Sequence, residues 1–396
     1  MNYKLDEVCD FYNGGAWSDK EYVSDGLPVL KVSNCKNKGF QIDNVNYLPV
    51  TLKEKYAKNK LRIGDVIIAT VGSHPSLIES AAGRSCIVNS LVEGFYLNQN
   101  AVCVRTKNLD VLDQRYLGYL CKERNFMHYI QNKGRGAANQ MRIAIGAIKE
   151  YELDLPDIDI QRRIAHILSA YDDSIENNQK QIKLLEEAAQ RLYKEWFVDL
   201  RFPGYENCKI VDGIPEKWER KKLVDIVDVQ YGYAFDGSKF NSVGKGTPII
   251  RIRNIPDGNT ADFTTEEAEE KYVISNGEIL VGMDGEFHIN SWSGKDAFLV
   301  QRTCCFRPRK REMKGWLLWA IYEPIKFYEK TVVGATVSHL GKKHIDSIEL
   351  LTGPEQLYIP FQNYFELRQK LLNQNIVLAE ARDRLLPKLM SGEIEV

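Results

Sequence analysis

The 396-residue sequence lacks the cysteine spacing, the long apolar runs and the basic excess that mark several classes of protein. Its eight cysteines show no C-x-x-C spacing, which argues against zinc ribbons and disulfide frameworks and favours reduced thiols. The longest apolar run, 316–322, is too short to cross a bilayer, and the polar first residues contain no apolar signal region. We therefore expect a cytoplasmic protein that makes no contact with a membrane.

The motifs of self-contained catalysis are absent as well. The sequence has no G-x-x-x-x-G-K-[ST] phosphate loop, no G-x-G-x-x-G after a strand, no H-E-x-x-H and no G-x-S-x-G. It also lacks the Asn-Pro-Pro-aromatic signature of amino-group DNA methyltransferases, and its six histidines are scattered. We predict no catalytic residue and no metal site in this chain.

The net charge is −1, from 53 Lys and Arg against 54 Asp and Glu, and no block of the chain is strongly basic. A polyanionic partner would therefore have to be met by local basic loops and not by a uniformly positive surface.

The sequence does contain one pattern twice. Six segments match in the same order: 26–34 with 246–254, 62–68 with 275–281, 96–105 with 298–307, 136–137 with 334–335, 161–164 with 356–359, and 185–192 with 378–385. The offset between the copies shrinks steadily along the chain, which indicates insertions in surface loops of the first copy.

Each copy has a strand-rich part and a helical part. We expect strands over 27–32, 66–70, 249–252 and 279–282, with helical stretches near 114–130 and 315–328. In the first helical part, residues that are all apolar except Asn178 follow a 4,3 spacing that is typical of a coiled coil: Ile164, Leu168, Tyr171, Ile175, Asn178, Ile182, Leu185, Ala189, Leu192 and Trp196. The second stripe is weaker because Arg368 and Arg382 fall on its seam. A single amphipathic helix on a globule is the alternative.

These patterns predict an α+β fold with pseudo-two-fold symmetry. Two similar mixed α/β domains, 1–155 and 202–353, are separated by two long helices that pack as an antiparallel coiled coil. The first helix lies within 156–201, and 354–396 comprises the second helix and the C-terminal tail. Antiparallel packing would bring Asn178 and Asn375 together and fix the register, unless each faces solvent. Two similar domains held at a fixed distance by rigid helices are suited to bind two short sequences at a fixed spacing on a linear polymer. DNA is the natural candidate for this polymer.

Short motifs flank both helices. Pro156 and Gln161-x-x-Ile164 open the first, and Pro354 and Gln356-x-x-Ile359 open the second. The segment LYKEWFVD (192–199) follows the first helix, LLPKLMSGEI (385–394) ends the second, and Gly-Asp (64–65) and Gly-Glu (277–278) each start a strand. In combination these motifs resemble the DNA-specificity subunit of type I restriction–modification systems, over essentially the whole chain.

The resemblance implies a non-catalytic subunit. Each globule would be a target-recognition domain that reads one half of a bipartite site on double-stranded DNA, and the helices would set the spacer. Two methyltransferase subunits would dock on the helical region, and restriction subunits with translocase activity would join them. S-adenosylmethionine, ATP and Mg²⁺ would be bound by those partners, so we expect no cofactor on this chain.

Loop residues with suitable donors and acceptors are candidate DNA contacts, because Arg and Lys suit guanine, and Asn and Gln suit adenine. They are Thr70, Ser73, His74, Arg84, Arg135, Asn139, Gln140 and Arg142 in the first domain, and Arg251, Arg253, Asp284, His288, Arg302, Ser338, His339, Lys342 and Lys343 in the second. For each residue an ordinary solvated turn is the alternative.

Gln99 and Gln301 fall at matched positions, so we assign them to the shared scaffold. Candidate partner contacts on the helices are Arg163, Arg191, Trp196, Phe197 and Arg384, for which packing against the globule is the alternative.

Three other hypotheses about the function of the chain remain open. The chain could be a coiled-coil scaffold with two β-rich modules that bind protein or carbohydrate, a free-standing sequence-specific repressor, or an enzyme. Near-neutral charge favours the scaffold, and the motifs that flank the helices favour the DNA-specificity reading.

Overall fold

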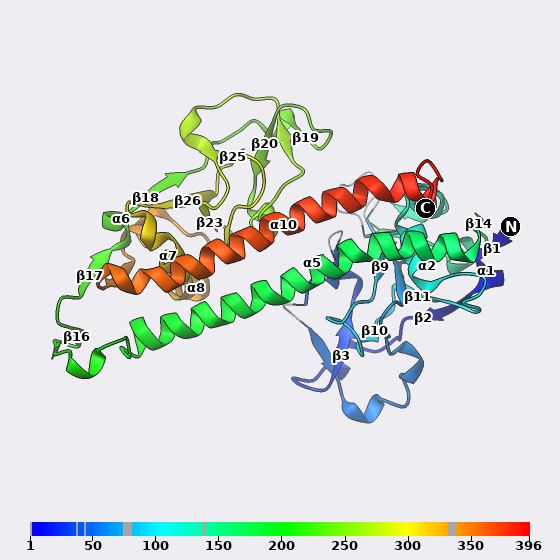
Figure 1. Ribbon diagram of the computed structural model, residues 1–396, viewed down its shortest axis with the longest axis horizontal. Helices are drawn as coiled ribbons and strands as arrows, with labels where there is room; N and C mark the ends of the chain where they lie inside the picture. The colour runs from blue at the N-terminus through cyan, green and yellow to red at the C-terminus, as the bar shows by residue number, and fades with distance from the viewer. Residues whose placement is uncertain (1, 37–38, 43–44, 74–80, 138–139, 332–337) are drawn as a thin grey trace. The chain divides into compact units, whose positions relative to one another are not determined.

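The computed structural model describes residues 2–36, 39–42, 45–73, 81–137, 140–331 and 338–396 (Figure 1). The chain divides into two compact units. Unit 1 comprises Met1–Asp173 and Glu380–Val396, and unit 2 comprises Ser174–Ala379. Each unit therefore combines one strand-rich domain with a stretch of both long helices.

The domain of unit 1 is built on a four-stranded antiparallel sheet of order β2-β11-β7-β9. These strands are β2 (Cys9–Asn13), β7 (Val66–Ala69), β9 (Ser85–Ile87) and β11 (Ala101–Thr106). Every residue of β7 is buried, as its apolar sequence Val-Ile-Ile-Ala requires.

The described part of this domain also contains smaller sheets and short helices. The sheets are β10-β3-β6, formed by β10 (Tyr96–Leu97), β3 (Leu27–Leu30) and β6 (Asn46–Leu48); β12-β13-β8, formed by β12 (Arg135–Ala137), β13 (Gln140–Arg142) and β8 (Val71–Gly72); β1 (Asn2–Lys4) with β14 (Glu152–Asp154); and β4 (Cys35–Lys36) with β5 (Gly39–Phe40). The helices are α1 (Leu5–Val8), α2 (Gln114–Lys122), α3 (Arg124–Asn132) and α4 (Ile145–Lys149).

The domain of unit 2 repeats this plan. Its four-stranded sheet has the order β18-β26-β23-β24, formed by β18 (Val227–Tyr231), β26 (Thr303–Pro308), β23 (Ile279–Gly282) and β24 (Ile289–Ser291). The repeat of two mixed α/β domains predicted from the sequence is confirmed.

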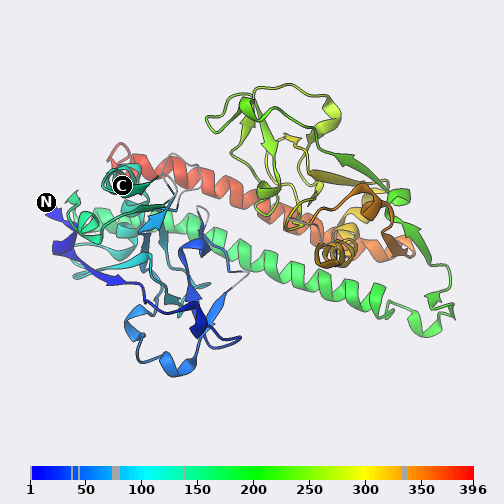
Figure 2. The same cartoon turned by 180° about the vertical axis from the view of Figure 1, so that it is seen from behind.

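The remaining elements of unit 2 are as follows. The strands are β15 (Ile210–Val211), β16 (Ile214–Pro215), β17 (Glu219–Lys222), β19 (Phe240–Asn241), β20 (Thr247–Ile250), β21 (Phe263–Thr264), β22 (Val273–Ile274), β25 (Ala297–Leu299) and β27 (Glu349–Thr352). The helices are α6 (Leu223–Ile226), α7 (Lys314–Ala320), α8 (Tyr322–Thr331) and α9 (Lys342–Asp346), and Figure 2 shows the same elements from behind.

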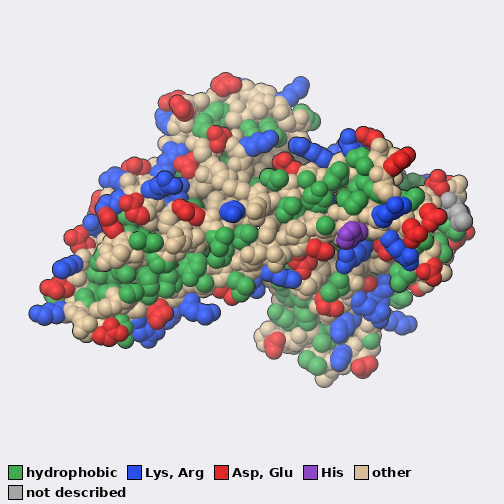
Figure 3. All heavy atoms as spheres, in the orientation of Figure 1, with side chains coloured by type: hydrophobic (Ala, Val, Ile, Leu, Met, Phe, Trp, Pro, Cys, Tyr) green, Lys and Arg blue, Asp and Glu red, His purple; other side chains and the backbone are tan. Residues whose placement is uncertain are grey.

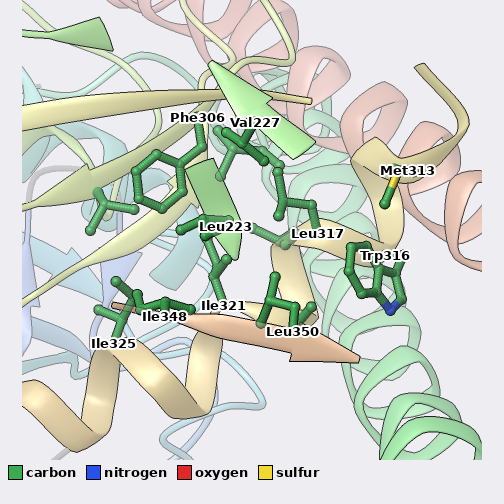
Figure 4. Close-up of a cluster of buried hydrophobic side chains, with 14 of the residues drawn as sticks. Leu223, Val227, Phe306, Met313, Trp316, Leu317, Ile321, Ile325, Ile348 and Leu350 are labelled. Carbon is green, nitrogen blue, oxygen red and sulfur yellow. The ribbon is translucent and has the colours of Figure 1, made fainter. Parts of the chain in front are cut away.

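An extensive hydrophobic core lies in unit 2, between its sheet and α6, α7 and α8. Leu223, Phe306 and Trp316 converge there and are at most 1% exposed (Figure 4). Helix α7 packs tightly on the second long helix, because a Cβ atom at Gly315 would lie 2.2 Å from the backbone oxygen of Phe361. Only glycine permits this close approach.

The two long helices are α5 (Ile158–Tyr193), which continues into a π-helical turn over Lys194–Val198, and α10 (Ile359–Met390). In unit 1, the start of α5 lies beside the end of α10: Leu389 belongs to the same core as Ile164 and Leu168. In unit 2, the rest of α5 lies beside the start of α10 (Figures 1 and 2). The helices run antiparallel within each unit.

The polar residues of the predicted seam pair with one another inside the units. Asn178 Nδ2 donates to Asn375 Oδ1 at 2.9 Å in unit 2, so the two amides are together. Arg368 Nε contacts Glu186 at 2.7 Å in unit 2, and Arg382 pairs with Asp172 in unit 1. The arginines that weaken the second stripe are therefore ion-pair partners of carboxylates on α5.

Candidate nucleic-acid interface

In unit 1, three segments meet where β7 ends. The backbone N–H of Thr70 donates to the oxygen of Asn100 at 2.8 Å, and the N–H of Ile143 donates to the oxygen of Thr70 at 2.8 Å. Beside this junction Val71 pairs with Arg142 across β8 and β13. The junction brings together the loop before β11, the end of β7 and the β12–β13 ribbon.

Unit 2 contains the same junction where β23 ends. The N–H of Met283 donates to the oxygen of Arg302 at 2.9 Å, and the N–H of Leu340 donates to the oxygen of Met283 at 2.7 Å. Asp284 and His339 pair as an antiparallel bridge, as Val71 and Arg142 do in unit 1. The backbone of the junction is therefore constant between the two units.

The side chains at equivalent positions differ in chemistry. Val71, Asn100 and Arg142 of unit 1 correspond to Asp284, Arg302 and His339 of unit 2. Asn100 (φ 77°) and Arg302 (φ 66°) both adopt the left-handed conformation, so the backbone is the same even where the residue type changes. A constant frame with variable side chains is what two recognition domains of different specificity require.

In unit 2 three of the predicted residues form one polar cluster. The carboxylate of Asp284 accepts a hydrogen bond from Arg302 and one from His339 Nδ1 at 2.5 Å. Its side chain is 13% exposed, whereas those of Arg302 and His339 are 67% and 58% exposed. Burial raises the pKa of Asp284, but the two hydrogen bonds outweigh burial and hold that pKa below its usual range.

In unit 1 two predicted arginines face each other across a β-ribbon. Arg135 of β12 and Arg142 of β13 are directly opposite in the ladder, and both are exposed. Neither has an ion pair with any other described residue. Like charges directly opposite are destabilising, and a polyanion against this face would remove the repulsion.

Three predicted arginines make contacts within their own domains. Arg84 Nη1 donates to the backbone oxygen of Cys35 at 2.7 Å, and Arg253 Nη2 contacts both carboxylate oxygens of Asp262, at 2.8 and 2.9 Å. Arg251 lies over the ring of Phe240, 5.7 Å from its centroid.

The other predicted residues fall into two groups. His74 and Asn139 lie outside the described residues, and only the backbone of Gln140 is described, in β13. Thr70 and Ser73 are half-buried at or after the junction; His288 Nδ1 lies 3.6 Å from Glu286; Ser338 accepts the N–H of Gly285; and Lys342 and Lys343 are exposed at the start of α9.

The residues predicted to contact partner subunits also fall into two groups, exposed arginines and packed aromatic residues. Arg163, Arg191 and Arg384 are exposed on the helices, but Phe197 is 4% exposed within the core of unit 2. Trp196 is half-buried against Phe361. The alternative expectation, packing against the globule, describes these two aromatic residues, so Phe197 is no longer a candidate contact.

Asn100, which shares the junction with Thr70, is not among the residues predicted from the sequence. In the alignment of segment 96–105 with segment 298–307, Asn100 takes the position of Arg302. A polar residue whose type differs between the two copies is the signal that indicates it. The acidic residues of the Gly-Asp and Gly-Glu motifs have a structural role that was not predicted either. Asp65 forms a bidentate ion pair with Arg105, in which each hydrogen bond is 2.6 Å long. Glu278 forms an ion pair with Arg307 at the equivalent position of unit 2.

Among the described residues, no group of three or more His, Cys, Asp or Glu side chains could hold a metal ion. Within the same residues, no helix has the length and apolar character needed to cross a membrane. All eight cysteines are free thiols.

Known proteins of one class resemble this chain. It is 28% identical over 305 residues to the MjaIX type I restriction enzyme specificity subunit of Methanocaldococcus jannaschii, an alignment that covers 72% of this chain and 70% of that protein. It is 26% identical over 408 residues to the MjaVIII specificity subunit of the same organism, with 95% and 91% covered. The crystal structure of a type I restriction–modification S subunit from M. genitalium shares the fold, with a TM-score of 0.54, 17% identity, and 98% and 95% of the two chains covered.

A family model for the type I restriction modification DNA specificity domain matches residues 1–187 and 215–354. The chain belongs to this family. It is thus a DNA-specificity subunit of the type I restriction–modification class, and catalysis lies in other subunits of such systems.

Proposed function

We propose that each unit reads one half of a bipartite double-stranded DNA target through its junction. The observation that carries this proposal is the repeat of one set of backbone hydrogen bonds with different side chains around it. Val71, Asn100 and Arg142 would distinguish the first half-site, and Asp284, Arg302 and His339 the second. Because the backbone frames are equivalent, each set of side chains would meet its own strand of DNA in the same way.

The chemistry at each junction suits the grooves of DNA. A two-stranded β-ribbon fits the major groove, so the β12–β13 ribbon would place Arg135 and Arg142 against base edges or phosphates. In unit 2, Lys342 and Lys343 follow the junction on an exposed turn of α9 and would contact phosphates.

The charge distribution supports local contacts. On the face drawn in Figure 3, Lys and Arg side chains lie among Asp and Glu side chains. With a net charge of −1, the chain would bind DNA through a few phosphates, so we expect a shallow but measurable dependence of affinity on salt.

The helices offer a surface for partner subunits. Five large apolar residues of these helices and the turn after α5 are between 46% and 65% exposed, all within unit 2: Leu184, Val198, Ile359, Leu367 and Val377. Hydrophobic side chains also gather along the helices on the left of Figure 3. Two methyltransferase subunits would dock here and on the exposed Arg163, Arg191 and Arg384, and restriction/translocase subunits would join them. S-adenosylmethionine, ATP and Mg²⁺ would be bound by those subunits and none by this chain.

The paired helices would set the gap between the half-sites. The hydrogen bond between Asn178 and Asn375 supports this, because an amide pair on the seam selects one register. Inserting four residues beside Asn178 should change the preferred gap or abolish binding; an unchanged gap would contradict the spacer role.

The proposed function is tested by binding-site selection from a pool of random DNA duplexes. The affinity for the selected duplex is then measured by gel shift over a series of salt concentrations. We expect a bipartite consensus and an affinity that falls with salt. A slope near zero and no consensus would favour a scaffold for protein or carbohydrate. Co-expression with a methyltransferase subunit adds a mass measurement: a free-standing repressor would remain alone.

A further inference from the structure

Arg302 occupies a backbone position that does not favour arginine. It directly precedes β26 with φ 66°, in the left-handed region, where an L side chain crowds its own backbone. The equivalent residue of unit 1 is Asn100, and asparagine is among the few residues that visit this region routinely. Unit 2 therefore holds an arginine where the local conformation works against it, and such positions concentrate at functional sites.

Asp284 fixes this arginine in place. Its mostly buried carboxylate accepts a hydrogen bond from Arg302 Nη1 and a second from His339 Nδ1. Unit 1 has Val71 at the equivalent position, so the junction folds without this ion pair. The carboxylate is thus an addition specific to unit 2.

The pair has the geometry of a base reader. A guanidinium has five N–H donors in a rigid plane, and a carboxylate that engages one nitrogen leaves the others free and orients them. Guanine presents two acceptors, O6 and N7, on its major-groove edge, whereas adenine presents one acceptor and one donor. A carboxylate beside an arginine that contacts phosphate would weaken that contact, because the negative charge of the carboxylate repels the phosphate.

We propose that Arg302 recognises a guanine in the half-site bound by unit 2 and that Asp284 is its positioning residue. This inference rests on the proposed DNA-reading function of the junction. His339 completes the arrangement, because its Nδ1 contacts the same carboxylate at 2.5 Å from the other side of the bridge.

The test is binding-site selection with the full chain and its co-purified partners, on wild type and variants. Arg302→Asn installs the residue of unit 1, which tolerates the backbone conformation. We expect one guanine position in one half-site to lose about tenfold or more of its discrimination, while every other position stays the same. A uniform loss of affinity across all sequences would overturn the inference, because it would make Arg302 a phosphate contact.

Asp284→Asn separates positioning from simple charge. Removal of a negative charge should raise affinity for non-specific DNA, while discrimination at the same guanine position falls. Unchanged discrimination in this variant would contradict the positioning role. A merely structural role would not produce these opposite changes.

Arg309→Ala is the matched control. Arg309 directly follows β26, as Arg302 directly precedes it, and it is 54% exposed and paired with Asp228 at 3.1 Å. Its removal should leave the consensus unchanged; loss of the same guanine in this variant would overturn the assignment to Arg302. Failure of the wild type to select any site would refute the proposed function itself, which is a different result.

Discussion

The two units keep one charged pair and differ at another position. Asp65 with Arg105 in unit 1, and Glu278 with Arg307 in unit 2, join the same two strands of the main sheet. Two residues beyond the end of β7, Val71 of unit 1 corresponds to Asp284, which lies two residues beyond the end of β23 in unit 2. Chemistry that is preserved between the units belongs to the shared frame, and the positions where chemistry changes are those that we propose to recognise DNA.

Breaking the preserved ion pair should give the largest effect on stability. The side chains of Asp65 and Arg105 are 5% and 16% exposed, so Asp65→Ala leaves a mostly buried guanidinium without its partner. We expect unit 1 to lose about 3 kcal/mol of unfolding free energy. Hydrogen exchange in β11 measures this loss.

Glu278→Ala is the comparison in unit 2. We expect a smaller loss there, because Arg307 is 34% exposed and water can solvate it. Equal and negligible losses in both variants would show that these pairs do not belong to the frame.

A matched pair of glycines should give the next largest effect. A Cβ atom at Gly14 would lie 1.9 Å from the backbone oxygen of Asn98, and one at Gly232 would lie 2.0 Å from that of Val300. Alanine at either position should cost about 2 kcal/mol, by similar amounts in the two units, because the frame is the same.

Gly146→Ala and Gly237→Ala are the controls, since no atom lies within 4 Å of the added methyl group in either case. Denaturant unfolding compares the four variants. A large cost at only one of the two matched glycines would contradict an equivalent frame.

The smallest effect concerns acid stability in unit 1. Burial raises the pKa of Asp172, but Lys122 and Arg382 outweigh burial and hold that pKa below 3.8. A lowered carboxyl pKa stabilises the folded state above its unfolded value and loses that contribution as the pH falls through the folded pKa. Asp172→Asn should therefore cost about 1 kcal/mol at pH 6.

The cost of Asp172→Asn should then shrink as the pH falls below 3.8, and urea unfolding at several pH values measures it. A cost that does not depend on pH would contradict the ionised state of Asp172.

The sequence predicted the architecture because the architecture depends on periodicity. The 4,3 spacing from Ile164 to Trp196 identified the first long helix, and six matched segments identified the repeated domains. One match was misleading: Gln161 is 1% exposed, whereas Gln356 is exposed on the turn before α10. Short motifs can agree in sequence although their side chains have different surroundings.

The candidate interface was less predictable because it depends on tertiary partners. Residue type alone could not show that Arg84 bonds a backbone carbonyl, that Arg253 is held by Asp262, or that Phe197 lies in a core. Residue type did select Asp284, Arg302 and His339, but only folding brings these three segments together. Their grouping required the structure.

The most direct test of the account exchanges residues 1–155 for the equivalent domain of another family member and sequences the DNA that the assembled complex selects. If each unit reads its own half-site through its own junction, one half of the consensus changes while the other half and the gap remain. A change in both halves would contradict the account, because it would mean that the two domains do not read DNA independently.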